Sequence, residues 1–86
     1  MKTYDFTIKA VRGLHAQPSA ALAAVASKSS CDVFIEHNGT EINVADPIKL
    51  MSALITCGER IILKVSGDDE DEIMKQLKQI IESQLL

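Results

Sequence analysis

The chain has 86 residues, of which 47% are hydrophobic and only 3% aromatic, and its formal net charge is -3. This length predicts a single domain over residues 1–86 with a core of aliphatic side chains. The acidic balance, with no basic run and no interleaved aromatic residues, argues against a nucleic-acid-binding protein. No apolar run is long enough for membrane insertion, and no signal-peptide core is visible.

The two cysteines indicate the cellular compartment. Cys31 and Cys57 have neither metal-ligand nor CxxC spacing. We expect them to be reduced thiols in a cytoplasmic protein, although two cysteines can also pair.

The first half of the chain predicts a strand, a helix and a hairpin. Polar and apolar residues alternate over residues 3–9, as in a half-buried strand. A helix is expected over residues 16–28, with Pro18, Leu22 and Val25 on its inner side. Residues 31–36 and 40–44 are expected to be strands. The intervening Asn38-Gly39 tolerates the positive φ angles of a tight hairpin turn.

The second half predicts a helix, a strand and a final helix. Asp46-Pro47 favours a helix start, because aspartate is a good N-cap and proline is tolerated in the first turn. This helix is expected to run to about residue 55, followed by a strand over residues 60–66. The acidic run over residues 68–72 fits the positive start of the last helix better than a metal site.

The element order β-α-β-β-α-β-α predicts an α+β fold. A four-stranded antiparallel sheet would be covered on one face by helices. The other face would be exposed to solvent and would carry Thr3, Asp5, Thr7, Phe34, Glu36, Glu41, Asn43, Ile62 and Lys64.

The motif Gly13-Leu14-His15-Ala16-Gln17-Pro18 places one histidine at the start of the first helix. The glycine allows the loop to fold back over the helix end, and the proline fits the first helical turn. Unpaired N–H groups and a partial positive charge at a helix start favour an anion. Imidazole is a nucleophile at neutral pH. The pattern therefore predicts a phosphoryl group carried on His15, whereas His37, beside the hairpin turn, is expected to be a surface residue.

Together with Asn38-Gly39, Asn43-Val44 and Leu50-Met51-Ser52, the histidine motif resembles HPr, the histidine-containing phosphocarrier of the bacterial phosphoenolpyruvate:sugar phosphotransferase system. The similarity covers essentially the whole chain, and the histidine motif is its specific part. The resemblance implies an open-faced β-sandwich of four antiparallel strands under three helices. It also implies a protein that needs no metal and no cofactor.

The same resemblance implies the roles of the site residues. His15 would accept a phosphoryl group from enzyme I through Nδ1 and pass it to a sugar-specific enzyme II component such as enzyme IIA. The backbone N–H groups of Ala16 and Gln17 would hold the phosphate, in agreement with the helix-start argument. Family members normally have arginine where this chain has Gln17, and a neutral amide binds phosphate less strongly than a guanidinium. Arg12, on the other side of the histidine, is a candidate substitute.

Asp46 is the second departure from the family pattern, because Gram-positive relatives carry a regulatory serine at this position. Aspartate cannot be phosphorylated by the kinase that modifies that serine, so we expect this control to be absent. Two interpretations stay open. The fixed charge either mimics phosphoserine or serves only as a helix cap, and capping alone explains both Asp46 and Pro47.

The short helix has more apolar residues than one face can bury. With Leu50 and Leu54 facing inward, Ile48, Met51 and Ile55 would remain outside. The resemblance implies a partner-binding surface over the two helices, formed by Leu14, Ala20, Ile48, Lys49, Met51, Ser52 and Ile55. An alternative to the carrier is therefore a regulatory interaction module that binds an enzyme or a transcriptional regulator through this surface. A phosphotransfer domain from a larger protein is a third possibility.

Overall fold

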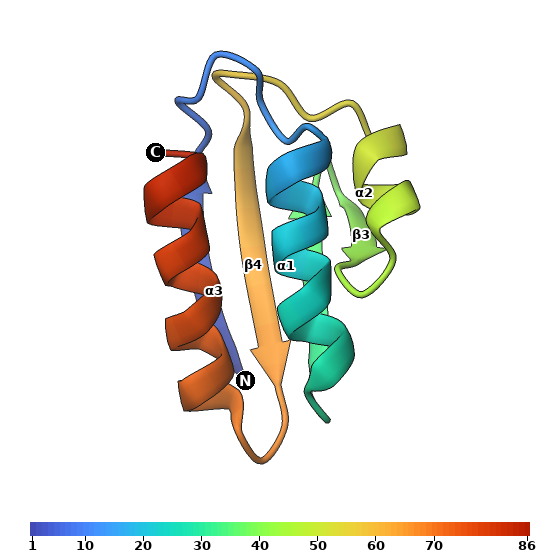
Figure 1. Ribbon diagram of the computed structural model, residues 1–86, viewed down its shortest axis with the longest axis vertical. Coiled ribbons are helices and arrows are strands. Elements are labelled where there is room, and N and C mark those ends of the chain that lie inside the picture. Colours follow the sequence, from blue (N-terminus) through green and yellow to red (C-terminus); the bar gives the residue numbers. More distant parts are fainter.

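The computed structural model describes residues 1–86, and it arranges the seven predicted elements in the predicted order (Figure 1). The chain passes through β1 (Lys2–Thr7), α1 (Ala16–Lys28), β2 (Asp32–His37), β3 (Thr40–Asn43), α2 (Pro47–Ser52), β4 (Arg60–Ser66) and α3 (Glu70–Gln84). None of these helices combines the length and the apolar character needed to cross a membrane.

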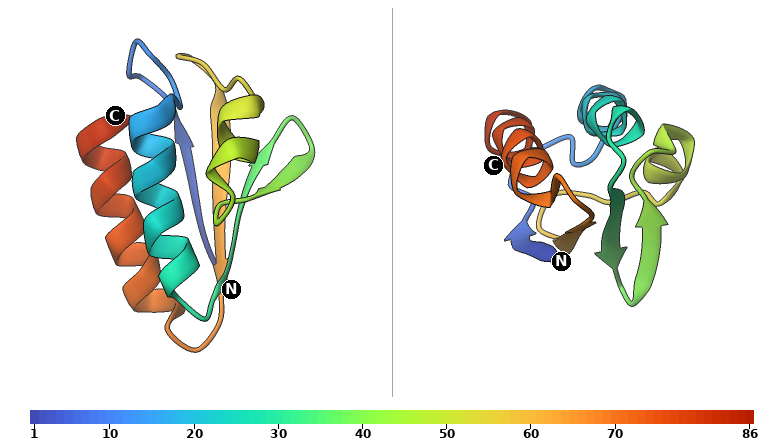
Figure 2. Two further views of the ribbon diagram at one scale, coloured as in Figure 1. Left: turned by 45° about the vertical axis from the view of Figure 1, so that its right-hand side comes forward. Right: turned by 90° about the horizontal axis from the view of Figure 1, so that it is seen from below.

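The four strands form one antiparallel sheet in the order β1-β4-β2-β3. The last strand of the chain, β4, is therefore central, and β1 and β3 are the edges. All three helices lie on the same face of this sheet (Figure 2). The predicted α+β open-faced sandwich is confirmed.

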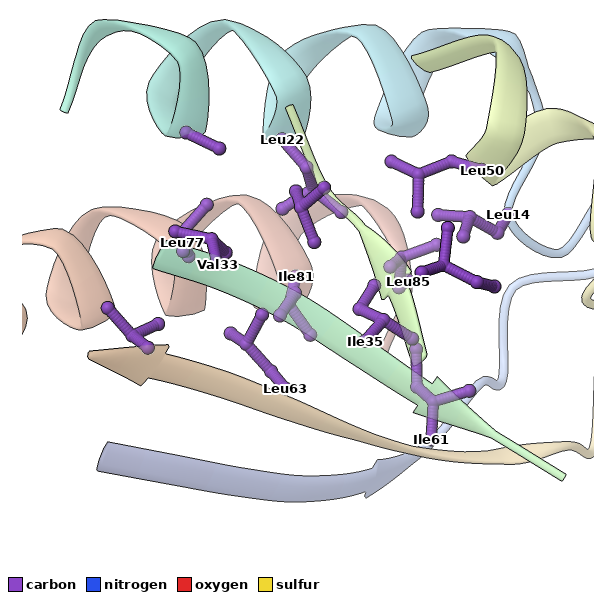
Figure 3. Packing of buried hydrophobic residues seen from close by; sticks show 14 of the residues in the cluster. Leu14, Leu22, Val33, Ile35, Leu50, Ile61, Leu63, Leu77, Ile81 and Leu85 are labelled. Atoms are coloured by element: carbon purple, nitrogen blue, oxygen red, sulfur yellow. The ribbon is translucent and has the colours of Figure 1, made fainter. Parts of the chain in front are cut away.

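The core lies between the helices and the sheet, and it consists almost entirely of aliphatic side chains. Ile61, Leu63 and Val65 alternate along β4 and are fully buried. Leu22 of α1 and Leu77 of α3 are also fully buried and point into the core from the helical layer (Figure 3). The period-2 pattern of the strand thus supplies one side of the core, and the helical stripes supply the other.

The opposite face of the sheet carries charged pairs. The Lys64 ammonium group donates to carboxylate oxygens of Glu36 at 2.7 Å and Glu41 at 2.8 Å. Arg60 donates both Nε and Nη2 to the carboxylate of Asp5. The residues expected on this face are exposed or half-buried, including the apolar Phe34 and Ile62. This prediction is confirmed.

The inner side of α1 includes more small residues than the predicted set. Pro18 and Leu22 are buried and Val25 is half-buried against the core, as expected for that side, and Ser19, Ala23 and Ala26 are buried with them. These small side chains allow α1 to pack closely against its neighbours.

The end of α2 differs more strongly from the predicted one. The helix stops at Ser52 instead of continuing to about residue 55. Leu54 then adopts a left-handed conformation with φ 53°, and its side chain is 77% exposed. Ile55, expected outside, is 2% exposed because this reversal turns it into the core.

Candidate functional site

His15 occupies the N-cap position of α1, with an extended backbone (φ -85°, ψ -169°). Its carbonyl accepts a hydrogen bond from the Ser19 N–H at 3.1 Å, which begins the helical ladder. The residue is half-buried, and its side chain forms no capping hydrogen bond. The imidazole is therefore held at the helix start by its backbone and has no hydrogen-bond partner within the chain.

The first turn of α1 leaves backbone donors free. The N–H groups of Ala16 and Gln17 have no acceptor within the chain, and Pro18 has no N–H group. No acidic side chain lies in this turn. Because an α-helix has partial positive charge at its start, these donors form a favourable environment for an anion beside the imidazole.

The loop before α1 is docked on the segment that follows α2. Gly13 adopts φ 64°, and a Cβ atom at this position would lie 2.5 Å from the Ile55 carbonyl oxygen and 2.8 Å from the Thr56 Cα. The Leu14 N–H donates to the same Ile55 carbonyl at 2.9 Å. Glycine is therefore required both by its backbone angle and by the close approach of another backbone.

Two buried side chains hold this loop on the body of the protein. Leu14 is 3% exposed and points into the core with Leu50 (Figure 3). Ser19 is fully buried, and its hydroxyl donates to the Leu14 carbonyl at 3.4 Å. The residue directly before His15 is thus fixed from both its side chain and its carbonyl.

The surface around His15 is partly apolar. Ile48 and Leu54 are 70% and 77% exposed. Val11, in the loop over residues 8–15 that precedes α1 (the histidine loop), is 92% exposed. Figure 1 shows that α2 lies beside the start of α1, at the same end of the molecule. We name this region the two-helix surface. It comprises the half-buried His15 and the exposed residues Val11, Arg12, Gln17, Ala20, Ile48, Lys49, Met51, Ser52 and Leu54.

The structure corrects two members of the predicted partner-binding set. Leu14 and Ile55 are buried and do not contribute side chains to the two-helix surface. Val11 and Leu54 are exposed there instead, and sequence reasoning missed both. The left-handed Leu54 could not be anticipated from helical periodicity, because it lies after the helix ends.

Asp46 is the N-cap of α2, as predicted. Its carboxylate accepts the Lys49 N–H at 3.2 Å, and Pro47 follows at the first helical position. The structural role of Asp46 is therefore that of an N-cap for α2.

A polar contact between distant segments was also missed. Glu59 accepts hydrogen bonds from the Thr56 N–H at 2.6 Å, the Thr56 hydroxyl at 3.2 Å and His37 Nε2 at 2.9 Å. These bonds, led by the one from the Thr56 backbone, hold the pKa of Glu59 below its ordinary value. His37 lies at the surface but is half-buried rather than fully exposed, and its side chain is 11% exposed. The Thr56-x-x-Glu59 spacing matches the capping-box pattern of a helix start, although here it precedes the strand β4.

The other groups considered for chemistry are the two cysteines and possible metal ligands. Both cysteines are free thiols, with Cys31 buried and Cys57 exposed. Nowhere do three or more His, Cys, Asp or Glu side chains gather as a metal site requires.

Comparisons with known proteins agree with this arrangement. The family model described as "PTS HPr component phosphorylation site" matches residues 2–83. The phosphocarrier protein HPr of Mycoplasma genitalium is 35% identical over 83 residues, which cover 95% of this chain and 94% of the relative. The HPr-like protein Crh of Halalkalibacterium halodurans is 35% identical over 77 residues, covering 90% and 92%.

A solved structure gives the same result. The histidine-containing phosphocarrier protein of a mycoplasma superimposes with a TM-score of 0.93 at 30% identity, covering 99% of this chain and 98% of the other. The fold and the histidine site thus define a phosphocarrier or Crh-like protein. The chain belongs to the HPr family, which implies components of the phosphotransferase system as partners.

Proposed function

We propose that His15 accepts a phosphoryl group from phosphorylated enzyme I and passes it to enzyme IIA components of the phosphotransferase system in the cytoplasm. The observation that carries this proposal is the position of His15 at the start of α1, next to the unpaired N–H groups of Ala16 and Gln17. We expect these backbone donors to bind phosphate oxygens, because they have no acceptor within the chain, and the imidazole has no competing hydrogen bond.

The proposed transfer needs no group beyond the two partner proteins. The lone pair of His15 Nδ1 attacks the phosphorus atom carried by enzyme I, so the P–N bond to His15 forms as the bond to enzyme I breaks. In the second step a nucleophile of enzyme IIA attacks the same phosphorus atom, and the imidazole leaves with its electron pair. Imidazole serves both steps because it is a good nucleophile and a good leaving group.

The two-helix surface is the proposed contact area for both partners. Exposed apolar side chains at Ile48, Met51 and Leu54 share this surface with the cationic Lys49 and Arg12. Exposed apolar patches of this kind are typical of protein docking sites, and methionine adapts to more than one partner. One surface around the reacting atom allows the carrier to meet its donor and acceptors in turn.

A second candidate function is a regulatory interaction module with weak phosphotransfer, binding an enzyme or a transcriptional regulator through the same surface. Gln17 favours this alternative, because it replaces the guanidinium that family members normally offer to phosphate. The similarity to a Crh protein as well as to phosphocarriers agrees with either function.

Intact mass measurement after incubation with phosphoenolpyruvate and enzyme I tests the proposal. We expect the chain to gain the mass of one phosphoryl group, and the modification to be lost in acid as a phosphoramidate. The His15→Ala variant should gain nothing, because Gln17 is not a nucleophile and the Ser19 hydroxyl is buried and bonded to the Leu14 carbonyl. No gain by the unmodified chain at high enzyme I concentration would favour the interaction module, and a gain by His15→Ala would contradict the assignment of His15.

A further inference from the structure

We propose that Glu59 is a positioning residue for His15, holding the turn on which the histidine loop is docked. This inference rests on the proposed function of His15 in phosphotransfer. Glu59 does not reach the reacting atoms, and it acts through Thr56, Ile55 and the backbone of the histidine loop.

The Glu59 carboxylate joins two distant parts of the chain. Its Oε2 accepts the N–H and hydroxyl groups of Thr56, at 2.6 Å and 3.2 Å. Its Oε1 accepts a hydrogen bond from His37 Nε2 at 2.9 Å. His37 is the last residue of β2 and is paired with Thr40 of β3. The turn over residues 56–59 is thus fixed to the β2–β3 hairpin through a single side chain.

The same turn supports both ends of the histidine loop. At the beginning of the loop, the Ile8 N–H donates to the Glu59 carbonyl at 2.9 Å, and the Gly58 N–H donates to the Ile8 carbonyl at 2.7 Å. At its end, Gly13 rests against the backbone of Ile55 and Thr56, and the Leu14 N–H donates to Ile55. His15 is the next residue, so a shift of this turn moves the backbone that carries the imidazole.

The contacts of Glu59 are stronger than those of a neutral side chain in the same position. A glutamate carboxyl is ionised at neutral pH, and the bonds from Thr56 and His37 lower its pKa further, so these hydrogen bonds are charge-assisted. The Thr56 hydroxyl and N–H would lose their acceptor without it. Removal of the carboxylate therefore frees the turn locally, while the core strands keep their own contacts.

Hydrogen exchange and phosphorylation rate together test this role in Glu59→Ala and Glu59→Gln. In Glu59→Ala we expect the Leu14 and Ile8 amides to exchange about tenfold faster relative to the Ile61 and Leu63 amides of β4, and His15 to be phosphorylated about tenfold more slowly. The Glu59→Gln variant keeps an oxygen that accepts from Thr56, so both values should stay within about threefold of the unmodified chain.

The outcomes separate positioning from general stability. Equal acceleration of the loop and β4 amides in Glu59→Ala would overturn the proposal, because it indicates global destabilisation. A Glu59→Gln variant as impaired as Glu59→Ala would also overturn it. If enzyme I does not phosphorylate the unmodified chain, the proposed function of His15 is wrong. The contribution of Glu59 to phosphotransfer is then wrong as well. Faster hydrogen exchange in Glu59→Ala at the Leu14 and Ile8 amides, but not at the β4 amides, would still show that Glu59 stabilises the backbone at His15.

Discussion

Replacement of Gly13 by alanine is expected to displace the histidine loop and to lower the rate of His15 phosphorylation by more than about tenfold. The new Cβ would lie 2.5 Å from the Ile55 carbonyl oxygen and 2.8 Å from the Thr56 Cα, and neither backbone atom can move without its segment. The φ angle of 64° adds strain of about 1–2 kcal/mol for an L-residue. Phosphorylation kinetics with enzyme I measure the effect of the displaced loop on His15. Thermal unfolding measures the loss of stability caused by the clash and the backbone strain.

Gly39→Ala is the matched control for this prediction. Gly39 has a φ angle of 79°, but a Cβ there would meet nothing within 4 Å. The control should lose about 1 kcal/mol of unfolding free energy through backbone strain and keep its phosphorylation rate. Equal phosphorylation rates in Gly13→Ala and the unmodified chain would show that the close approach to Ile55 and Thr56 does not position His15.

The second large effect is expected from Gln17→Arg, which should raise the phosphorylation rate about tenfold. Gln17 is exposed in the first turn of α1, with its backbone N–H unpaired. A guanidinium there adds a positive charge and a planar set of donors for the transferring phosphoryl group. Single-turnover measurement with phosphorylated enzyme I gives the rate directly, and Gln17→Lys, a point charge without the planar geometry, should give a smaller gain.

Arg12→Ala tests whether a nearby cation already replaces the missing arginine. Arg12 is exposed in the histidine loop and forms no ion pair with any carboxylate of the chain. If Arg12 assists transfer of the phosphoryl group, Arg12→Ala alone should slow the phosphorylation of His15. The same substitution should reduce the rate by a smaller factor in a chain that also carries Gln17→Arg. An unchanged rate in Arg12→Ala would end the hypothesis of compensation by Arg12.

Local sequence signals predicted the architecture well because each element is encoded by short-range chemistry. The alternation in residues 60–66 matches β4, and Asn38-Gly39 occupies the hairpin turn with φ angles of 52° and 79°. Asp46 and Pro47 begin α2 as cap and first residue. His15 at the start of α1 likewise followed from the glycine before it and the proline after it.

The parts that sequence reasoning missed depend on contacts between distant segments. Ile55 is buried because Leu54 reverses the chain, and no periodic pattern encodes that reversal. His37 meets Glu59 across 22 positions of sequence. The docking of Gly13 on Ile55 and Thr56 also joins segments that only the fold brings together. The position of His15 at the helix start was therefore predictable, but the contacts that support its loop were not.

The most direct measurement of the central claim is a ¹H–¹⁵N correlation spectrum of the labelled chain before and after phosphorylation by enzyme I. A phosphoryl group on His15 at the start of α1 should change the Nδ1 resonance of that ring. It should also shift the Ala16 and Gln17 amide signals more than any others in the protein, because those two N–H groups gain an acceptor. A phosphorylated chain in which these two amides stay unmoved, or in which another residue carries the group, would contradict the account.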